Sequence, residues 1–204
     1  MFINFLLVLY CFYELMNSVI EQKANGLLKS LREGDMIFVN EKGLPNFLGR
    51  LLQRYEWHHV LLYLGDGKVL EAIPIKGCRV SSLKLDSRYN GLKILRYKGI
   101  SPAQRRKLVA NAVRTFLNKK FSWLQILKTL LAREFWLGRL LRLRFASWKN
   151  YKCNPNAVMC SNLITMSYYM AGLLIFDAYP PEYVMPKDYE NASRLETIVK
   201  IGQA

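Results

Sequence analysis

The sequence predicts an α+β fold, and three observations support this class. The chain has 204 residues, of which 51% are hydrophobic and 13% aromatic, so it can bury a sizeable core. Short apolar runs separated by turn residues fill the first half, which is typical of a small, mostly antiparallel sheet. Apolar residues at helical spacing dominate the second half. Strands followed by helices, rather than strands alternating with helices, indicate the α+β class.

The strands are predicted from short apolar runs bounded by turn residues. Two of these runs are separated by Gly65-Asp66-Gly67-Lys68, and an Asp-Gly pair favours the tight turn of a β-hairpin. The expected strands are residues 36–39, 59–64, 69–72, 79–83, 92–97 and 195–201.

The helices are predicted from apolar spacing and from capping signals. Ser101-Pro102-Ala103-Gln104 is typical of a capping box with proline at the first helical position, so a helix is expected to begin there. Further helices are expected over residues 48–54 and 157–172, and Pro186 predicts a short helical turn.

Residues 2–13 form an apolar run ahead of the predicted domain. The run lacks the basic start and the cleavage site of a standard signal peptide, and it is short for a bilayer span. Three interpretations are open: an uncleaved membrane anchor, an atypical signal, or a helix packed on the domain. We expect an apolar N-terminal helix or anchor over residues 1–30 and the functional domain over residues 31–204. If the run is an anchor, the basic residues that follow it predict a cytoplasmic domain.

The chain is strongly basic, with 30 lysines and arginines against 15 acidic residues and a net charge of +15. Such a charge favours an anionic partner: a phospholipid surface, a nucleic acid or an acidic polymer. Nucleic acid is the least favoured, because the sequence has no zinc-finger spacing, no RNP-like strand and no clean basic recognition helix. We expect a membrane or cell-envelope surface.

Residues 123–148 interleave tryptophan, phenylalanine and leucine with arginine. This composition is typical of a segment that lies at a lipid headgroup boundary. The basic positions scatter around a helix, however, so a buried helix pair with solvated arginines is the favoured interpretation.

Four cysteines are present: Cys11, Cys78, Cys153 and Cys160. They form no CxxC pair and no metal-binding spacing with the two histidines, so no metal or cofactor is expected. A disulfide between Cys153 and Cys160 would consume a candidate nucleophile, and we predict free thiols. Cys160 precedes an apolar helical stretch, and a cysteine in the first turn of a helix is stabilised as a thiolate. The alternative is that Cys160 is a small buried hydrophobic residue.

Any cysteine–histidine catalysis must use His58 or His59, which point to opposite faces of a strand. Glu71 lies within an apolar strand, and an imidazole on the neighbouring strand could pair with it. A two-residue hairpin loop pairs Glu71 with Leu62, on the His58 face. A three-residue loop with a bulge pairs it with Tyr63, on the His59 face. A structural histidine and an exposed edge-strand glutamate are the alternatives.

These segments resemble the permuted branch of the NlpC/P60 superfamily. Residues 59–72, HVLLYLGDGKVLEA, and residues 160–164, CSNLI, look like the YiiX/YebB-like proteins, which are kin to the lecithin retinol acyltransferase-like enzymes. Residues 34–39 are similar to the family's opening strand, and residues 185–189 to its closing Pro-Asp element. The resemblance implies a circularly permuted papain-like fold in which the histidine strand precedes the cysteine helix.

The resemblance also implies the roles of three residues. Cys160 is the nucleophile, His59 is the base, and Glu71, twelve positions after the histidine, is the third polar residue of the catalytic set. This choice favours His59 over His58 and the bulged register. Asn162 departs from the acidic residue that often follows Cys-Ser, and Phe121-Ser122 replaces a frequent Tyr-Asp.

The implied activity is that of a cysteine hydrolase of the amidase or peptidase type. It would form a thioacyl-enzyme on a peptide or amide bond of the cell envelope, with the backbone amide of Cys160 helping to bind the oxyanion. One alternative is a lipid acyl hydrolase or acyltransferase at a membrane surface. Another is a non-catalytic, membrane-associated binding protein that kept the fold.

Overall fold

The computed structural model describes residues 26–27, 29–41, 57, 59–84, 89–134, 156, 158–177 and 180–202. The strands are β1 (Met36–Glu41), β2 (His59–Gly65), β3 (Lys68–Ile73), β4 (Gly77–Ser82), β5 (Tyr89–Tyr97) and β6 (Leu195–Gly202). The helices are α3 (Pro102–Phe116), α4 (Trp123–Glu134) and α6 (Cys160–Met170). Two short 3-10 helices follow, η2 (Pro181–Tyr183) and η3 (Pro186–Asn191).

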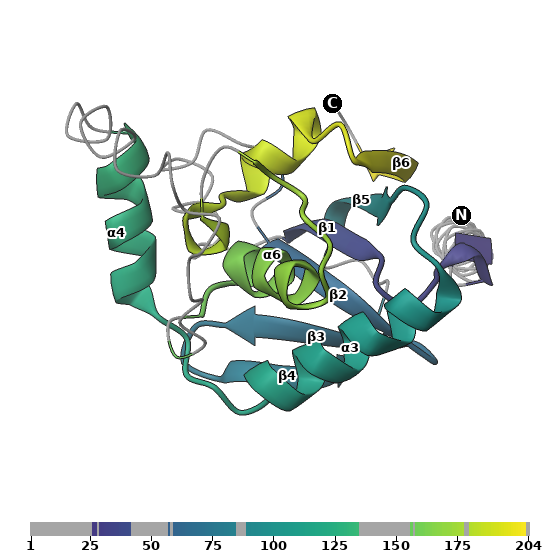
Figure 1. Cartoon of the computed structure of the whole chain (residues 1–204), viewed down its shortest axis with the longest axis horizontal. Helices are drawn as coiled ribbons and strands as arrows, with labels where there is room; N and C mark the ends of the chain where they lie inside the picture. Colours follow the sequence, from purple (N-terminus) through teal and green to yellow (C-terminus); the bar gives the residue numbers. More distant parts are fainter. Residues whose placement is uncertain are drawn as a thin grey trace, which may run out of the picture.

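The strands form one six-stranded antiparallel sheet in the order β4-β3-β2-β1-β5-β6. Helices α3 and α6 lie together on one face of this sheet, and α4 stands apart at one side (Figure 1). The histidine strand β2 precedes the cysteine helix α6 along the chain. The predicted α+β class, with a small antiparallel sheet and the permuted strand–helix order, is confirmed.

The helix α3 begins at the predicted capping box. Ser101 Oγ accepts a hydrogen bond from the Gln104 backbone amide at 3.3 Å, and Gln104 Oε1 accepts one from the Ser101 amide at 3.0 Å. Two otherwise unsatisfied amides of the first turn are therefore bonded, which defines the start of the helix.

Both faces of the sheet are buried, and alternation along β2 divides its side chains between two clusters. Val60 and Leu62 belong to the cluster that packs against α3 and α6. Leu61 and Tyr63 belong to a second cluster on the opposite face. His59 shares the Leu61 side of the strand by alternation. From the first position of β2, however, its side chain also hydrogen-bonds Cys160 of α6, which packs against the first cluster.

The hairpin of β2 and β3 contains the predicted bulge, just before its turn. Beyond the bulge Tyr63 pairs with Val69. Continued along the strands, this register puts Glu71 opposite Leu61, so the predicted pairing with Tyr63 is wrong by two residues. The extra residue lies beside a two-residue turn rather than in a three-residue loop. The predicted face is nevertheless correct, because Leu61 and His59 share a side of the strand.

Asp35, which directly precedes β1, is fully buried and holds the sheet to the helices. Arg96 of β5 donates to both carboxylate oxygens, from Nε to Oδ1 at 2.8 Å and from Nη2 to Oδ2 at 2.7 Å. Arg105 Nη1 of α3 lies 3.7 Å from Oδ1. The Tyr168 hydroxyl of α6 donates to the neighbouring Gly34 carbonyl. The cluster therefore links β1, β5, α3 and α6.

The helix α6 is shorter than the predicted span of residues 157–172. Val158 forms a parallel bridge with Phe121, and the Ser122 amide donates to the Val158 carbonyl at 2.8 Å. These bonds keep the segment before residue 160 extended. The helix consequently begins at Cys160 itself, which occupies its first position.

The helix α4 exposes apolar side chains and buries polar ones. Its exposed apolar residues are Trp123, Leu124, Leu127 and Leu131, at 62%, 59%, 53% and 44% exposure. Gln125 and Thr129 are buried instead, and Gln125 Nε2 donates to the Glu182 carbonyl of η2 at 2.9 Å. The favoured prediction of a buried helix pair is wrong for this part of residues 123–148, because Leu124, Leu127 and Leu131 face solvent.

Some sequence predictions fall outside the described residues. They concern the apolar run of residues 2–13, the helix over residues 48–54, residues 135–148, His58, Cys11 and Cys153. The domain boundary near residue 31 likewise stays a prediction. Within the described part of the chain, no helix has the length and apolar character needed to cross a membrane.

Candidate functional site

Cys160 lies at the N-terminus of α6, and the surrounding hydrogen bonds fix its position. The Met159 amide donates to Asn162 Oδ1 at 2.7 Å, which caps the first turn. Ser161 Oγ donates to the Val184 carbonyl at 2.7 Å and ties the helix start to the loop after η2. Cys160 is partly exposed, whereas the next eight residues are buried. The residue is therefore held firmly in place while staying partly exposed.

The surroundings of Cys160 favour its thiolate. Burial raises the pKa of the thiol, but a hydrogen bond from His59 and the charge of the imidazolium lower it. The backbone amides of Val60 and Ser161 also bond the sulfur and lower the pKa further. The lowering effects outweigh burial, so the pKa of Cys160 lies below that of an ordinary thiol. A low pKa is what a nucleophilic cysteine requires at neutral pH.

His59, the first residue of β2, lies between the thiol and Glu71. Its Nε2 is 3.6 Å from Glu71 Oε2, and the two side chains are only 13% and 10% exposed. Because Nε2 faces the carboxylate, we assign Nδ1 to the hydrogen bond with Cys160. The structure thus brings the three residues selected from the sequence into one chain of contacts.

Glu71 is held by two further groups besides the imidazole. Its Oε1 accepts from Arg79 Nε at 3.1 Å and from Ser81 Oγ at 2.6 Å, both on the neighbouring strand β4. Burial raises the pKa of Glu71, but the bonds from His59 and Ser81 and the charges of His59 and Arg79 lower it more. The carboxylate is therefore ionised at neutral pH and oriented toward the imidazole.

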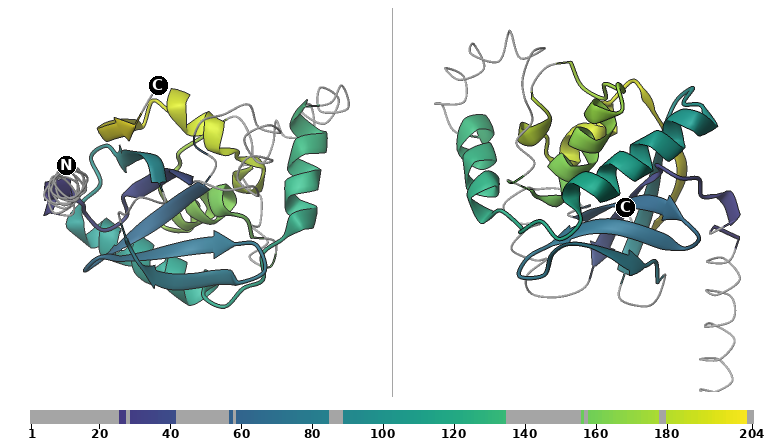
Figure 2. Two further views of the ribbon diagram at one scale, coloured as in Figure 1. Left: turned by 180° about the vertical axis from the view of Figure 1, so that it is seen from behind. Right: turned by 60° about the horizontal axis from the view of Figure 1, so that its bottom comes forward.

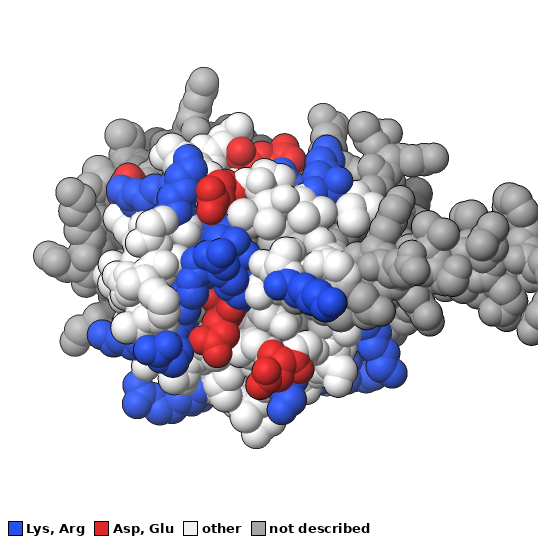
Figure 3. Space-filling view, turned by 90° about the vertical axis from the view of Figure 1, so that its right-hand side faces the viewer, with Lys and Arg blue, Asp and Glu red and all other residues white. Residues whose placement is uncertain are grey.

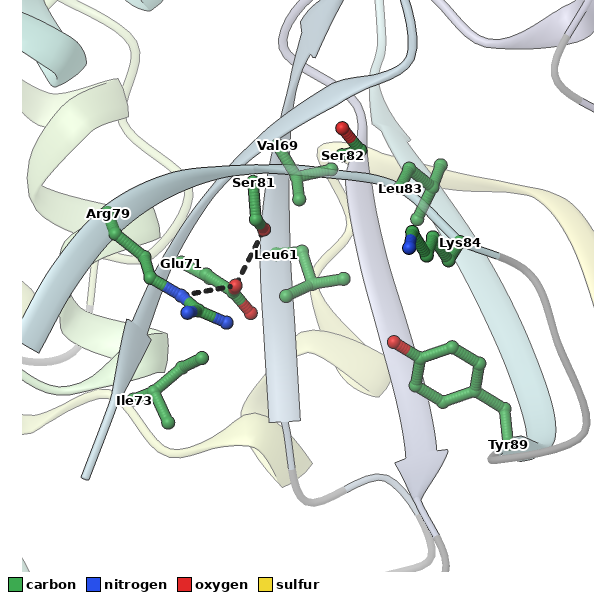
Figure 4. Close-up of a pocket in the computed structure, with 10 residues that line it drawn as sticks. All are labelled: Leu61, Val69, Glu71, Ile73, Arg79, Ser81, Ser82, Leu83, Lys84 and Tyr89. Carbon is green, nitrogen blue, oxygen red and sulfur yellow. Dashed lines mark hydrogen bonds and ion pairs between the residues drawn. The ribbon is translucent and has the colours of Figure 1, made fainter. Parts of the chain in front are cut away.

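A cavity of about 490 Å³ lies beside Glu71 (Figure 4). Arg79 and Ser81 point toward Glu71 within it, and Tyr89 and Lys84 lie on its other side. Neither Cys160 nor His59 is among its lining residues. The cavity is therefore a neighbour of the carboxylate and not the place where the thiol would meet a substrate.

Cys78 of β4 lacks the hydrogen bonds that lower the pKa of Cys160. Its side chain is buried, and burial, with the nearby charge of Cys160, raises its pKa to about 12. Both Cys78 and Cys160 are free thiols, as predicted. Cys78 is consequently an internal reference for an inert cysteine.

Arg79 and Ser81 were missed by the sequence analysis. Arg79 pairs directly with Glu71 across β3 and β4. Opposite charges at facing positions of two predicted strands are the signal that could have identified this pair. Asn162, noted as a departure from the family pattern, accepts the bond that caps α6, as an acidic side chain would.

These features define a class of protein: a small α+β fold of papain-like type in permuted order, with a partly exposed cysteine beginning a helix beside a histidine strand. A particular solved structure has the same fold, metalloprotein yiiX from Escherichia coli O157:H7. The similarity covers 84% of this chain and 98% of that chain, with a TM-score of 0.56 and 17% sequence identity. It supports the YiiX-like part of the predicted resemblance at the level of the fold. No family model and no curated protein matches the sequence.

The yiiX protein is described as a metalloprotein. In the described part of the present chain, no group of three or more histidine, cysteine, aspartate or glutamate residues is arranged to hold a metal ion.

Proposed function

We propose that this chain is a cysteine hydrolase of the amidase or peptidase type, in the YiiX/YebB-like branch of the permuted NlpC/P60 superfamily. The observation that carries the proposal is the contact chain from the Cys160 thiol through His59 to Glu71. A thiol with a lowered pKa, a base bonded to it and a carboxylate behind the base are the parts that nucleophilic catalysis by cysteine requires. The substrate we propose is a peptide or amide bond of the cell envelope.

The proposed reaction has two steps. His59 accepts the Cys160 proton and the thiolate attacks the carbonyl carbon. The C–N bond then breaks, and the amine leaves with the proton from His59 while a thioester stays on the sulfur. Water then attacks the thioester, with His59 as base, and releases the acid and the thiol. Glu71 acts as a positioning residue, because it orients the imidazole and stabilises its cation without touching the substrate.

Oxyanion stabilisation is assigned to backbone amides at the start of α6. The Cys160 amide lies at the positive end of the helix, where developing negative charge on the carbonyl oxygen is favoured.

A trapped acyl-enzyme tests this proposal. The purified chain is mixed with short envelope-type peptides, acyl amides and phospholipids, quenched in acid, and read by intact mass and peptide mapping. The proposal predicts an acyl adduct on Cys160 and turnover that Cys160→Ala abolishes, while Cys78→Ala keeps both. Turnover that survives in Cys160→Ala would contradict it.

A second candidate is a lipid acyl hydrolase or acyltransferase. The observation that favours it is the position of α4, whose exposed apolar side chains begin directly after Ser122, a residue hydrogen-bonded to the segment before Cys160. In the same experiment this alternative predicts fatty-acyl adducts from phospholipid and none from peptides.

A further inference from the structure

The outer face of α4 is reversed relative to an ordinary surface helix. A helix packed on a domain buries its apolar stripe and exposes polar residues. Here buried Gln125 and Thr129 face η2, while the exposed face carries Trp123, Leu124, Leu127 and Leu131. Contiguous exposed apolar groups of this kind mark an interaction surface.

The turn between β3 and β4 adds a second apolar element at the start of α4. Ile75, at the tip of this turn, is 99% exposed and has a φ of 71°, a conformation that a β-branched residue rarely adopts. The turn is fixed from behind, because the Cys78 amide donates to the Lys119 carbonyl at 2.8 Å. Gly77 has no room for a side chain, since an added Cβ would lie 2.5 Å from that carbonyl. Ile75 is thus presented to solvent by a rigid support.

The turn and the start of α4 lie side by side at one end of the molecule (Figures 1 and 2). We call this the α4 surface: Ile75, Lys76, Leu117, Lys119, Lys120, Trp123, Leu124, Leu127, Lys128 and Leu131. Leu117 adds to its apolar part with 38% exposure.

The charge of the α4 surface has one sign. Residues 117–131 contain three lysines and no acidic residue, and the turn adds Lys76. The side of the molecule away from α4 is different, since acidic and basic side chains are interspersed there (Figure 3). A surface with apolar groups surrounded by lysines complements an anionic lipid bilayer, in which acyl chains lie beneath negative headgroups.

We propose that the α4 surface docks on an anionic lipid bilayer, with Trp123, Leu127 and Ile75 entering the headgroup region. This inference goes beyond the proposed function and does not require catalysis. It has a consequence for the site, however. Ser122, which begins the α4 segment, bonds the Val158 carbonyl two residues before Cys160, so docking brings the thiol close to the membrane surface.

The test uses the full chain and vesicles of phosphatidylcholine with or without phosphatidylglycerol. Flotation measures binding, and hydroxyl-radical footprinting read by mass spectrometry measures protection of individual side chains. Footprinting distinguishes docking through α4 from binding through the apolar residues 2–13. We expect binding to the anionic vesicles, with protection of Trp123, Leu127 and Ile75 and no change at Ile201, which is 45% exposed on β6.

Matched variants separate the contributions of charge and apolar contact. Lys119→Glu with Lys120→Glu and Lys128→Glu should weaken vesicle binding at least about 100-fold, given roughly a fivefold effect for each basic residue removed. The same charge change at Lys68, Arg106 and Lys107, at the start of β3 and in the first half of α3, should cost much less. Leu124→Gln with Leu127→Gln should abolish protection of Trp123, whereas Ile201→Gln should not.

Three results would overturn the proposal: unchanged labelling of Trp123 and Leu127 on vesicles, equal binding to neutral vesicles, or protection of α4 by self-association without lipid. Cys160→Ala should bind vesicles like the wild type, because docking does not need the thiol. A failure of the catalytic proposal can therefore be distinguished from a failure of docking.

Discussion

Two buried carboxylates with different hydrogen-bonding partners, Asp35 and Glu71, show how the same chemistry serves the fold in one place and a site in another. Both oxygens of Asp35 are bonded to Arg96, and Arg105 lies behind them. In Glu71 one oxygen accepts hydrogen bonds from Arg79 and Ser81, and the other faces His59.

The two carboxylates differ in whether one of their oxygens is directed at a titratable group. Asp35 is fully buried, and its charge is balanced within a closed cluster that joins sheet and helices. Glu71 is 8% exposed, and the side chain of its partner Arg79 is 42% exposed. The second oxygen of Glu71 is directed at the His59 ring, which contacts the Cys160 thiol. A saturated buried pair stabilises a fold, whereas a carboxylate with an oxygen directed at an imidazole can tune chemistry.

The largest effect on stability is expected from Asp35→Asn. The change removes the carboxylate that is paired with the buried guanidinium groups of Arg96 and Arg105, which costs about 3–5 kcal/mol in the free energy of unfolding. Urea denaturation measures this loss. Asp177→Asn is the matched control, because its partner Arg194 lies at the surface, and it should cost less than about 1 kcal/mol. Equal losses in the two variants would break the distinction between buried and surface carboxylates.

Glu71→Gln should have a smaller effect on stability and a larger one on the thiol. We expect the alkylation rate of Cys160 at pH 7 to fall about tenfold or more, because the imidazolium loses the charge that stabilises it. The unfolding free energy should fall by about 1.5–3 kcal/mol, as for a hydrogen bond to a charged group. Glu190→Gln, which removes a surface carboxylate paired with Lys93, is the control and should leave the rate unchanged.

The pH dependence of stability provides a third contrast. The pKa of folded Glu71 is lowered, so its contribution is present above the unfolded pKa of about 4.3 and is lost as the pH falls through the folded pKa. The stability difference between wild type and Glu71→Gln should therefore shrink between pH 6 and pH 3. A difference that grows toward acid would mean that the carboxyl group is neutral in the folded state.

Arg79→Ala should have the smallest effect of the three test substitutions. The arginine side chain is 42% exposed, so its pair with Glu71 is screened by water and is worth less than about 1 kcal/mol. Ser81 and His59 still hold the carboxylate, so the alkylation rate of Cys160 should change by less than about threefold. Thermal unfolding and thiol labelling of the same sample measure both effects.

Much of the fold could be predicted from the sequence because its signals are local. The Asp-Gly turn and the Ser101 capping box each depend on a few adjacent residues, and both are present in the structure. The predicted pairing partner of Glu71 was wrong because one bulged residue near the turn changes the register of the two strands. No residue type signals the position of such a bulge unambiguously. The predicted start of α6 was wrong because the bridge between Val158 and Phe121 keeps the preceding segment extended. This bridge is a tertiary contact, which local sequence does not signal.

The candidate site was predictable as a set of residues but not as a geometry. Cys160, His59 and Glu71 could be selected because the chain offers only two histidines and carries the motif spacing. The support from Arg79 and Ser81 was missed, since it depends on strand register across two hairpins. The exposed face of α4 could not be predicted either, because composition alone does not say which side of a helix meets the domain.

The most direct test of the central claim is the alkylation rate of each cysteine as a function of pH, measured by mass spectrometry in wild type and in His59→Ala. The account predicts that Cys160 reacts rapidly well below the ordinary thiol pKa of about 8.5, that Cys78 stays unreactive, and that His59→Ala removes the fast reaction of Cys160. If Cys160 instead reacts as slowly as Cys78, or reacts equally fast without His59, the catalytic pair does not exist and the chain is better described as a binding protein.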